Sequence, residues 1–161
     1  MGCDCVRLVI ADTGPLNYLI QIGRVDILPR LFERVVIPNA VRIERSHPLA
    51  PPSVRAWMQA PPAWLEIHET HDISPVAGLD EGEAAAISLA LSRHADMLLI
   101  DERTGSRVAQ TRDLLVTGTL GVLDLAAERG LIDFADAIRA LELTSFRRPE
   151  ALLKLLLEKH P

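Results

Sequence analysis

Short stretches of apolar residues, each followed by a turn and then by a helical pattern, recur along this chain. Five of them suit buried strands: 6–11, 35–37, 64–68, 97–100 and 114–117. The segments between them carry apolar residues at the three- and four-residue spacing of helices. Strands that alternate with helices favour parallel pairing, because each helix returns the chain across the sheet. The sequence therefore predicts a three-layer α/β/α fold around a mostly parallel sheet of about five strands.

Helices are expected between and after these strands. Pro15 stands near the first turn of one helix and Pro38 opens another, both positions that tolerate proline. The segment 47–62 holds five prolines and is expected to be a loop around a short helix at 54–58. Further helices are expected at 16–22, 25–32, 81–94, 104–110, 118–129, 133–143 and 149–160, with a loop at 73–78.

The length of 161 residues suits one domain, and the chain shows no internal repeat or linker. We expect a single domain over 1–161, with a core at about 6–135 and C-terminal helices at about 133–160. No apolar run reaches the ~20 residues of a membrane span, so a membrane protein is not expected. Cys3 and Cys5 are too close in sequence to join distant segments, which predicts a reduced, cytoplasmic protein.

The charge balance limits how the chain can meet a polyanion. Its net charge is −5, and aromatic residues make up only 4%. Such a surface repels nucleic acid at long range and offers few rings for base stacking. Carboxylates gathered around divalent cations would nevertheless create a phosphate-binding site.

Several acids are placed to form such a site. Asp12 follows the first expected strand, and Asp101 follows the fourth; ligands of parallel sheets bind at these strand ends. Glu83 lies in the first turn of the Ala-rich helix, and Glu44 lies in the helix after the second strand. Glu102 ranks below Asp101, because neighbouring residues of an extended chain point to opposite sides. Convergence of the four preferred carboxylates would suit Mg²⁺ or Mn²⁺.

Each acid also has a structural explanation. Asp12 and Asp101 are residue types that cap helices, and each precedes an expected helix. Asp80 and Glu83 have the spacing of a capping box, and Glu44 is compatible with an exposed helix face. Spacing alone leaves these alternatives open.

Other catalytic patterns are missing from the sequence. It has no glycine-rich phosphate loop, no dinucleotide fingerprint and no nucleophile elbow. Trp57 and Trp64 are expected to pack in the core or in a lid. The histidines lack the paired spacing of a zinc helix; they are His47, His68, His71, His94 and His160.

Five stretches together resemble the PIN-domain family, in particular a toxin-like branch whose members are mostly described as uncharacterised nucleic-acid-binding proteins. The resemblance spans about residues 6–135, and the last stretch is the most specific. The stretches are 9–16 (VIADTGPL), 36–44 (VIPNAVRIE), 78–87 (GLDEGEAAAI), 98–103 (LLIDER) and 116–123 (VTGTLGVL).

The resemblance implies a Mg²⁺- or Mn²⁺-dependent endoribonuclease, the toxin of a toxin–antitoxin pair. Asp12, Glu83 and Asp101 would hold the metal, and Glu44 would complete the acidic ring or orient water. RNA would be the substrate, a small antitoxin a partner, and a homodimer the assembly. The third acid is Glu83 where better-known toxins have Asp, and their usual Asp-Phe ending of the fourth segment is missing.

Supporting roles follow from the same residues. Thr13 would hydrogen-bond to Asp12, and the 117–119 turn would meet phosphate through its backbone N–H groups. Arg103 and Arg107 are candidates for RNA backbone contact. The leucine stripe at 152–157 suits a core, a dimer interface or an antitoxin groove, with core preferred.

Two other functions remain open at this point. A catalytically silent PIN-like module would bind RNA or protein without cleaving it. A small-molecule phosphatase is less favoured, because Thr13 and Gly14 follow Asp12 where a second Asp is expected.

Overall fold

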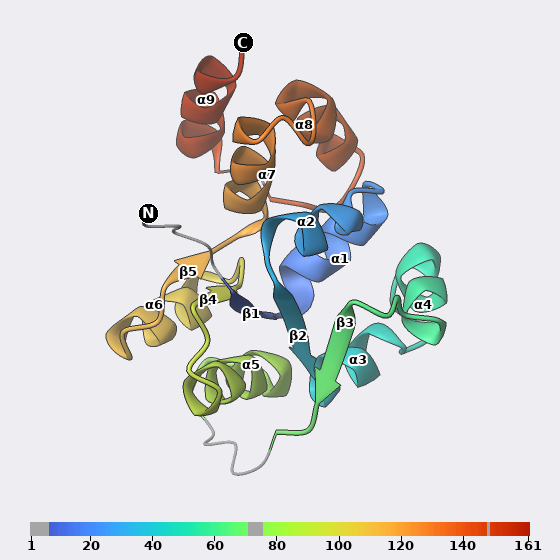
Figure 1. Ribbon diagram of the computed structural model, residues 1–161, viewed down its shortest axis with the longest axis vertical. Coiled ribbons are helices and arrows are strands. Elements are labelled where there is room, and N and C mark those ends of the chain that lie inside the picture. The colour runs from blue at the N-terminus through green and yellow to red at the C-terminus, as the bar shows by residue number, and fades with distance from the viewer. Residues whose placement is uncertain (1–6, 71–75, 148) are drawn as a thin grey trace.

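The computed structural model describes residues 7–70, 76–147 and 149–161 (Figure 1). Cys3, Cys5, His71 and the start of the expected loop at 73–78 lie outside these residues. The described chain contains a five-stranded sheet in which every pairing is parallel. Its strands are β1 (Leu8–Ala11), β2 (Arg34–Pro38), β3 (Leu65–His68), β4 (Met97–Leu99) and β5 (Val116–Thr117). The predicted α/β fold with five strands is confirmed, although β5 covers only the second half of the expected segment 114–117.

Strand order places β1 at the centre of the sheet. The order is β3-β2-β1-β4-β5, so the chain first moves outward from β1 to β3 and then returns to the other side of β1. Val9 pairs with Val35 on one side and with Met97 on the other. The strand order therefore reverses beside β1, and the crevice at the carboxyl ends of β1 and β4 is where such sheets bind ligands.

The helices lie close to their expected positions, with ends that differ by a few residues. A short 3₁₀ turn, η1 (Val25–Ile27), precedes the second helix. The helices are α1 (Thr13–Gln21), α2 (Leu28–Leu31), α3 (Asn39–Arg45), α4 (Pro52–Gln59), α5 (Glu81–Ser92), α6 (Arg103–Thr111), α7 (Thr119–Glu128), α8 (Phe134–Glu142) and α9 (Glu150–Lys159).

Alternating strand residues divide the interior into two cores, one on each face of the sheet. Val9 and Leu99 share a cluster with residues of α1, α4, α7 and α8, whereas Ile10 and Leu98 share one with residues of α5 and α6. Side chains alternate between the faces of a strand, so burial on both faces requires consecutive apolar residues. This explains the continuous apolar runs in the sequence and the three layers seen in Figure 1.

Helix α9 is only partly packed. Leu153 is buried and Leu156 packs against the same core, but Leu152, Leu155 and Leu157 are 45%, 64% and 37% exposed. The interpretation of the stripe as core is therefore wrong for these three leucines, because one helix face suffices to contact the domain. At the end of the helix, His160 Nε2 lies 2.7 Å from Asp124 Oδ1 of α7.

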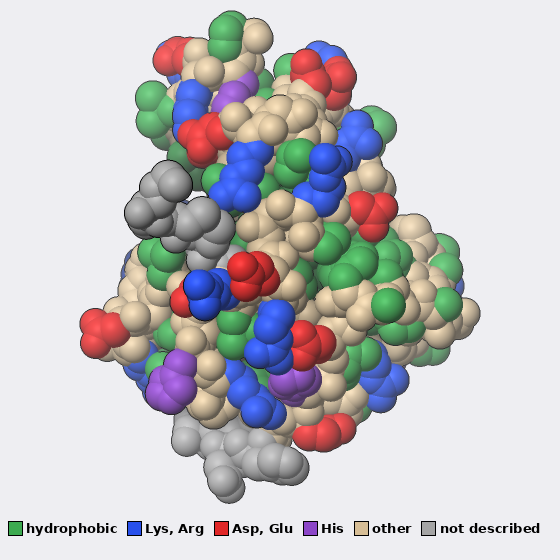
Figure 2. Space-filling view, viewed as in Figure 1, with side chains coloured by type: hydrophobic (Ala, Val, Ile, Leu, Met, Phe, Trp, Pro, Cys, Tyr) green, Lys and Arg blue, Asp and Glu red, His purple; other side chains and the backbone are tan. Residues whose placement is uncertain are grey.

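The surface carries charges of both signs. On the face that Figure 2 shows, Lys and Arg side chains are interspersed with Asp and Glu. Within the described residues, no helix has the length and apolar character required to cross a bilayer.

Candidate active site

Asp12 is a buried acid with one oxygen left unsatisfied. It follows β1 directly, and its backbone N–H donates to the carbonyl oxygen of Leu99 at 2.9 Å. The residue is 3% exposed, makes no side-chain cap to α1, and has no hydrogen-bond partner for Oδ1. The side chain therefore does not act as the helix cap that the sequence allowed. A buried carboxylate oxygen without a donor calls for another source of positive charge.

The electrostatics of Asp12 identify its neighbours. Burial raises the pKa of its carboxyl from 3.8 to about 7, against the effect of the Thr13 backbone hydrogen bond. The negative charges of Glu83, Asp80 and Glu44 raise this pKa further, in that order. Three carboxylates from two separate segments, α3 and the start of α5, therefore act on one buried acid.

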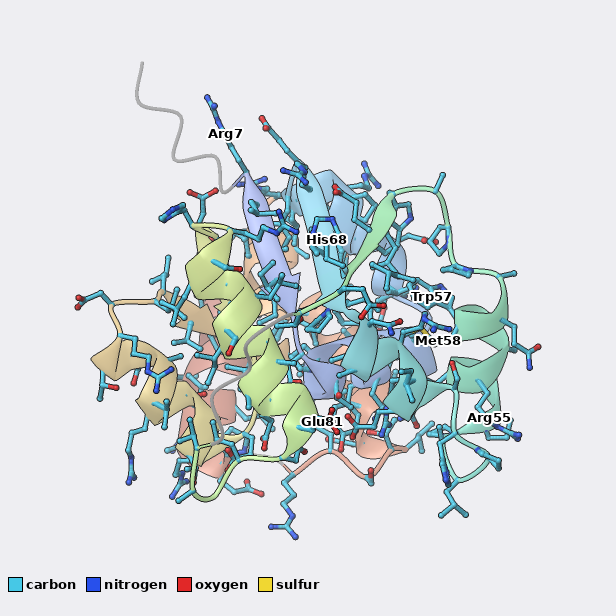
Figure 3. All side chains as sticks on the ribbon, turned by 90° about the horizontal axis from the view of Figure 1, so that it is seen from below. Arg7, Arg55, Trp57, Met58, His68 and Glu81 are labelled. Atoms are coloured by element: carbon cyan, nitrogen blue, oxygen red, sulfur yellow. The ribbon has the colours of Figure 1, made fainter. Side chains whose placement is uncertain are left out.

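Glu83 and Asp80 hold one another at the start of α5. The Glu83 N–H donates to Asp80 Oδ1 at 2.7 Å, and the Asp80 N–H donates to Glu83 Oε1 at 2.9 Å. The predicted capping box is confirmed. Glu83 is 8% exposed, and burial raises its pKa. Figure 3 shows Glu81 at the opposite end of the molecule from Arg7, so α5 begins at the carboxyl edge of the sheet.

Glu44 reaches this group from α3. Its Oε2 accepts the Thr13 hydroxyl at 2.9 Å, and its Oε1 lies 3.3 Å from the Arg45 guanidinium. The Thr13 hydroxyl therefore bonds to Glu44 and not to Asp12, because the first turn of α1 presents it to α3; the bond from Thr13 to Asp12 comes from its backbone N–H. Glu44 is 37% exposed at its side chain, but it is engaged by two neighbours and differs from a free surface carboxylate.

Asp101 is held by the first residue of α7. Its Oδ1 accepts the Thr119 N–H at 2.7 Å, and its Oδ2 accepts the Thr119 hydroxyl at 2.6 Å. The residue has solvent-exposed surface, yet its carboxyl group is enclosed by protein, and this desolvation raises its pKa against the two Thr119 bonds. Glu102, not Asp101, caps α6 through Thr104 and Gly105. The capping role considered for Asp101 at α6 is wrong.

Three glycines leave room for these carboxylates. A Cβ on Gly14 would lie 3.1 Å from Asp101 Oδ2, and one on Gly118 would lie 2.5 Å from Asp101 Oδ1. A Cβ on Gly82 would lie 2.8 Å from Glu44 Oε2. Each of these glycines follows an acid or a threonine, within the stretches D-T-G, D-E-G-E and T-G-T. A glycine in such a place was thus a sequence signal that a carboxylate packs closely against it.

The four predicted acids converge at one edge of the sheet, in two groups. The charges of Glu44 and Glu83 act on Asp12, together with that of Asp80, which the sequence presented as a helix cap. Asp101 lies beside Gly14 at the start of α1 but is not among the charges that raise the Asp12 pKa. The 117–119 turn does not offer all its N–H groups to phosphate, since that of Thr119 is engaged by Asp101.

The carboxylate oxygens of these acids are the kind of ligand that divalent cations such as Mg²⁺ prefer. Among residues 7–70, 76–147 and 149–161, no three His, Cys, Asp or Glu groups already stand in a metal-holding arrangement. The unsatisfied Asp12 Oδ1 and the mutual repulsion of the acids nevertheless fit an ion that prefers hard oxygen ligands. Side-chain movements would be needed to close the acids around it.

Comparisons with known proteins bear on the fold. A family model described as a PIN domain matches residues 8–161. Among curated proteins, Protein SEY1 of Phaeosphaeria nodorum is 32% identical over 78 residues, which cover 45% of this chain and 9% of that protein. Since so little of its length is matched, this relative says nothing about the activity of the chain.

Proposed function

The chain belongs to the PIN-domain family, and we propose on this basis that it is a metal-dependent endoribonuclease. PIN domains are generally nucleases and typically use divalent metals. The observation that carries the proposal for this chain is the buried Asp12 carboxyl, with an unsatisfied oxygen and three further acids close enough to raise its pKa.

Asp12, Glu83 and Asp101 are the residues that would hold Mg²⁺ or Mn²⁺, and Glu44 would complete the acidic ring or orient water. When bound, the ion supplies positive charge that offsets these carboxylates and polarises an RNA phosphodiester. Glu44 is suited to the water because its side chain is 37% exposed.

The chain itself holds three of these acids in place. Thr13 donates to Glu44, the Asp80 N–H donates to Glu83, and Thr119 donates twice to Asp101. Preorganised ligands lose little conformational freedom on binding, which favours both affinity and rate. Asp12 retains its proton below pH about 7 and releases it when positive charge arrives.

A direct test is the substitution Asp12→Asn. The variant keeps the size of the side chain and removes the charge, so RNA cleavage with added Mg²⁺ should be lost. Asp133→Asn is the matched control, because Asp133 caps α8 away from the acids. Cleavage by Asp12→Asn at the wild-type rate would contradict the assignment.

A catalytically silent RNA- or protein-binding module is the second candidate. It is favoured by the Arg45 guanidinium, which lies 3.3 Å from Glu44 Oε1 and offsets part of the negative charge that would attract a cation. Wild-type protein that binds RNA but shows no saturable Mg²⁺ or Mn²⁺ site would support this function instead.

We also propose the finer assignments that the resemblance implies. The protein would act in the cytoplasm as the toxin of a toxin–antitoxin pair, as a homodimer and as one domain over 1–161. Shared packing of Leu153 with Val9 supports the single domain, and the exposed leucines of α9 support a protein partner.

Growth arrest on expression, relieved by Asp12→Asn, tests the toxin role. Light scattering of wild type and Leu155→Glu tests the dimer.

A further inference from the structure

Both hydrogen-bond donors of Thr119 bond to the same carboxylate. Thr119 is completely buried, with 0% exposure, and its N–H and hydroxyl contact different oxygens of Asp101. We propose that Thr119 is a positioning residue that holds the Asp101 carboxylate in the orientation used to bind the divalent cation. This inference rests on the proposed function.

The two contacts differ in what they restrain. A bond from the N–H alone leaves the carboxyl group free to turn about its Cβ–Cγ bond. The hydroxyl bond to the second oxygen at 2.6 Å prevents that rotation. Because an ionised carboxylate accepts about four hydrogen bonds or ligands, lone pairs of both oxygens remain for a cation. The hydroxyl therefore fixes the direction of Asp101 without consuming its capacity as a ligand.

Gly118 leaves the space that the Asp101 carboxylate occupies. Its backbone is extended, with φ −104° and ψ −170°, which any residue adopts. The glycine is therefore not required by the backbone conformation. It is required by Asp101, whose Oδ1 would lie 2.5 Å from a Cβ at this position.

A purely structural role of the Asp101–Thr119 pair predicts a different result. Asp101 also satisfies an N–H in the first turn of α7, where Gly118 has no side chain to act as a cap. If this were the whole function of the pair, loss of the Thr119 hydroxyl would lower the unfolding temperature and leave cation affinity unchanged. Affinity for the metal alone therefore separates positioning from stability.

The experiment measures Mn²⁺ binding by calorimetry on the full chain, below the unfolding temperature of each variant. Thr119→Val should weaken Mn²⁺ binding about tenfold or more, the usual effect of losing a group that orients a metal ligand. Thr119→Ser retains the hydroxyl and should restore most of the affinity. RNA cleavage should show a lower kcat with little change in KM.

Thr144→Val is the matched control. It also removes a partly buried hydroxyl, one that donates to the Leu141 carbonyl oxygen at 2.7 Å. Its Mn²⁺ affinity should equal that of the wild type. Gly118→Ala serves if Thr119→Val does not fold, because it retains both donors and displaces the carboxylate; it too should weaken Mn²⁺ binding about tenfold.

The outcomes are distinguishable. If wild type binds Mn²⁺ and cleaves RNA while folded Thr119→Val or Gly118→Ala binds Mn²⁺ equally well, this inference is overturned and the proposed function stands. Loss of affinity in Thr144→Val as well would also overturn it, because the effect would then be a general one. If the wild type itself neither binds Mn²⁺ nor cleaves RNA, the proposed function fails and the positioning role fails with it.

Discussion

The backbone N–H of Asp12 donates to the carbonyl oxygen of Leu99 at 2.9 Å, one residue beyond the end of β1. This bond continues the pairing of β1 with β4 by one residue and fixes the backbone of Asp12 to the sheet. Helix α1 begins at the next residue, so the carboxylate is enclosed at the strand end. An acid buried by its own backbone should leave measurable effects on stability, binding and activity.

The first prediction concerns stability against pH without metal. The pKa of Asp12 is about 7 in the fold and 3.8 in the ordinary state, so the folded protein binds an extra proton between these values. The contribution of Asp12 to the free energy of unfolding should therefore be greatest below pH 3.8. It should decrease as the pH rises to about 7 and then level off. The loss should be on the order of 4 kcal/mol, from about 1.36 kcal/mol per pKa unit.

Urea unfolding between about pH 5.5 and 8 in the presence of a chelator measures this slope, and Asp12→Asn should reduce it. Glu83 and Asp101 leave a remaining slope of the same sign, because burial raises their pKa values as well. Glu66 has the opposite effect, because its bond to Arg34 lowers its pKa from 4.5 to about 2. That contribution rises with pH through 4.5 and is nearly complete at about pH 5.5, where the measured window begins. Equal slopes for wild type and Asp12→Asn would contradict the burial argument.

The second prediction concerns Mn²⁺ affinity. Because a cation competes with the proton on Asp12, affinity should fall about tenfold for each pH unit below 7 and level off above it. Calorimetry in two buffers of different ionisation enthalpy should detect about one proton released per ion at pH 6. Binding without proton release would show that Asp12 is not a ligand.

The third prediction concerns Gly82 in the first turn of α5. Alanine is favoured over glycine in helices by about 0.5–1 kcal/mol, but its Cβ would lie 2.8 Å from Glu44 Oε2. Since Glu44 is partly exposed, its side chain has room to move and should lose the Thr13 bond. Gly82→Ala should keep its stability within about 1 kcal/mol while RNA cleavage falls about tenfold or more.

Unfolding and cleavage assays check this prediction, with Ser88→Ala in the same helix as the control. Wild-type activity in Gly82→Ala would show that the position of Glu44 does not matter for the reaction.

The fourth prediction separates capping from function. Asp80→Ala and Asp133→Ala each remove an N-cap side chain, from α5 and α8 respectively, and each should cost about 1 kcal/mol of stability. Only Asp80→Ala should also reduce cleavage and Mn²⁺ affinity, because Asp80 orders the turn that carries Glu83. Equal activity of the two variants at matched stability would assign Asp80 a structural role alone.

Much of the fold could be predicted from local patterns. Val9 and Ile10 are neighbours buried on opposite faces of β1, so the strand has to appear as a continuous apolar run. The Asp80–Glu83 capping box joins residues three positions apart, a distance that helix geometry sets by itself. The strands, the helices and this box were therefore visible in the sequence and are confirmed.

The choice of partner for each polar side chain was decided only by tertiary structure. The Thr13 hydroxyl donates to Glu44, 31 residues away, instead of to the adjacent Asp12, and Asp101 pairs with Thr119 instead of capping α6. Sequence spacing determines contacts within about one helical turn. Contacts between segments depend on how α1, α3 and α7 pack around the sheet, and that packing depends on the shapes of many side chains at once. The sequence thus determined which acids are present and which segments carry them. The fold decided which groups surround each acid and how its pKa is shifted.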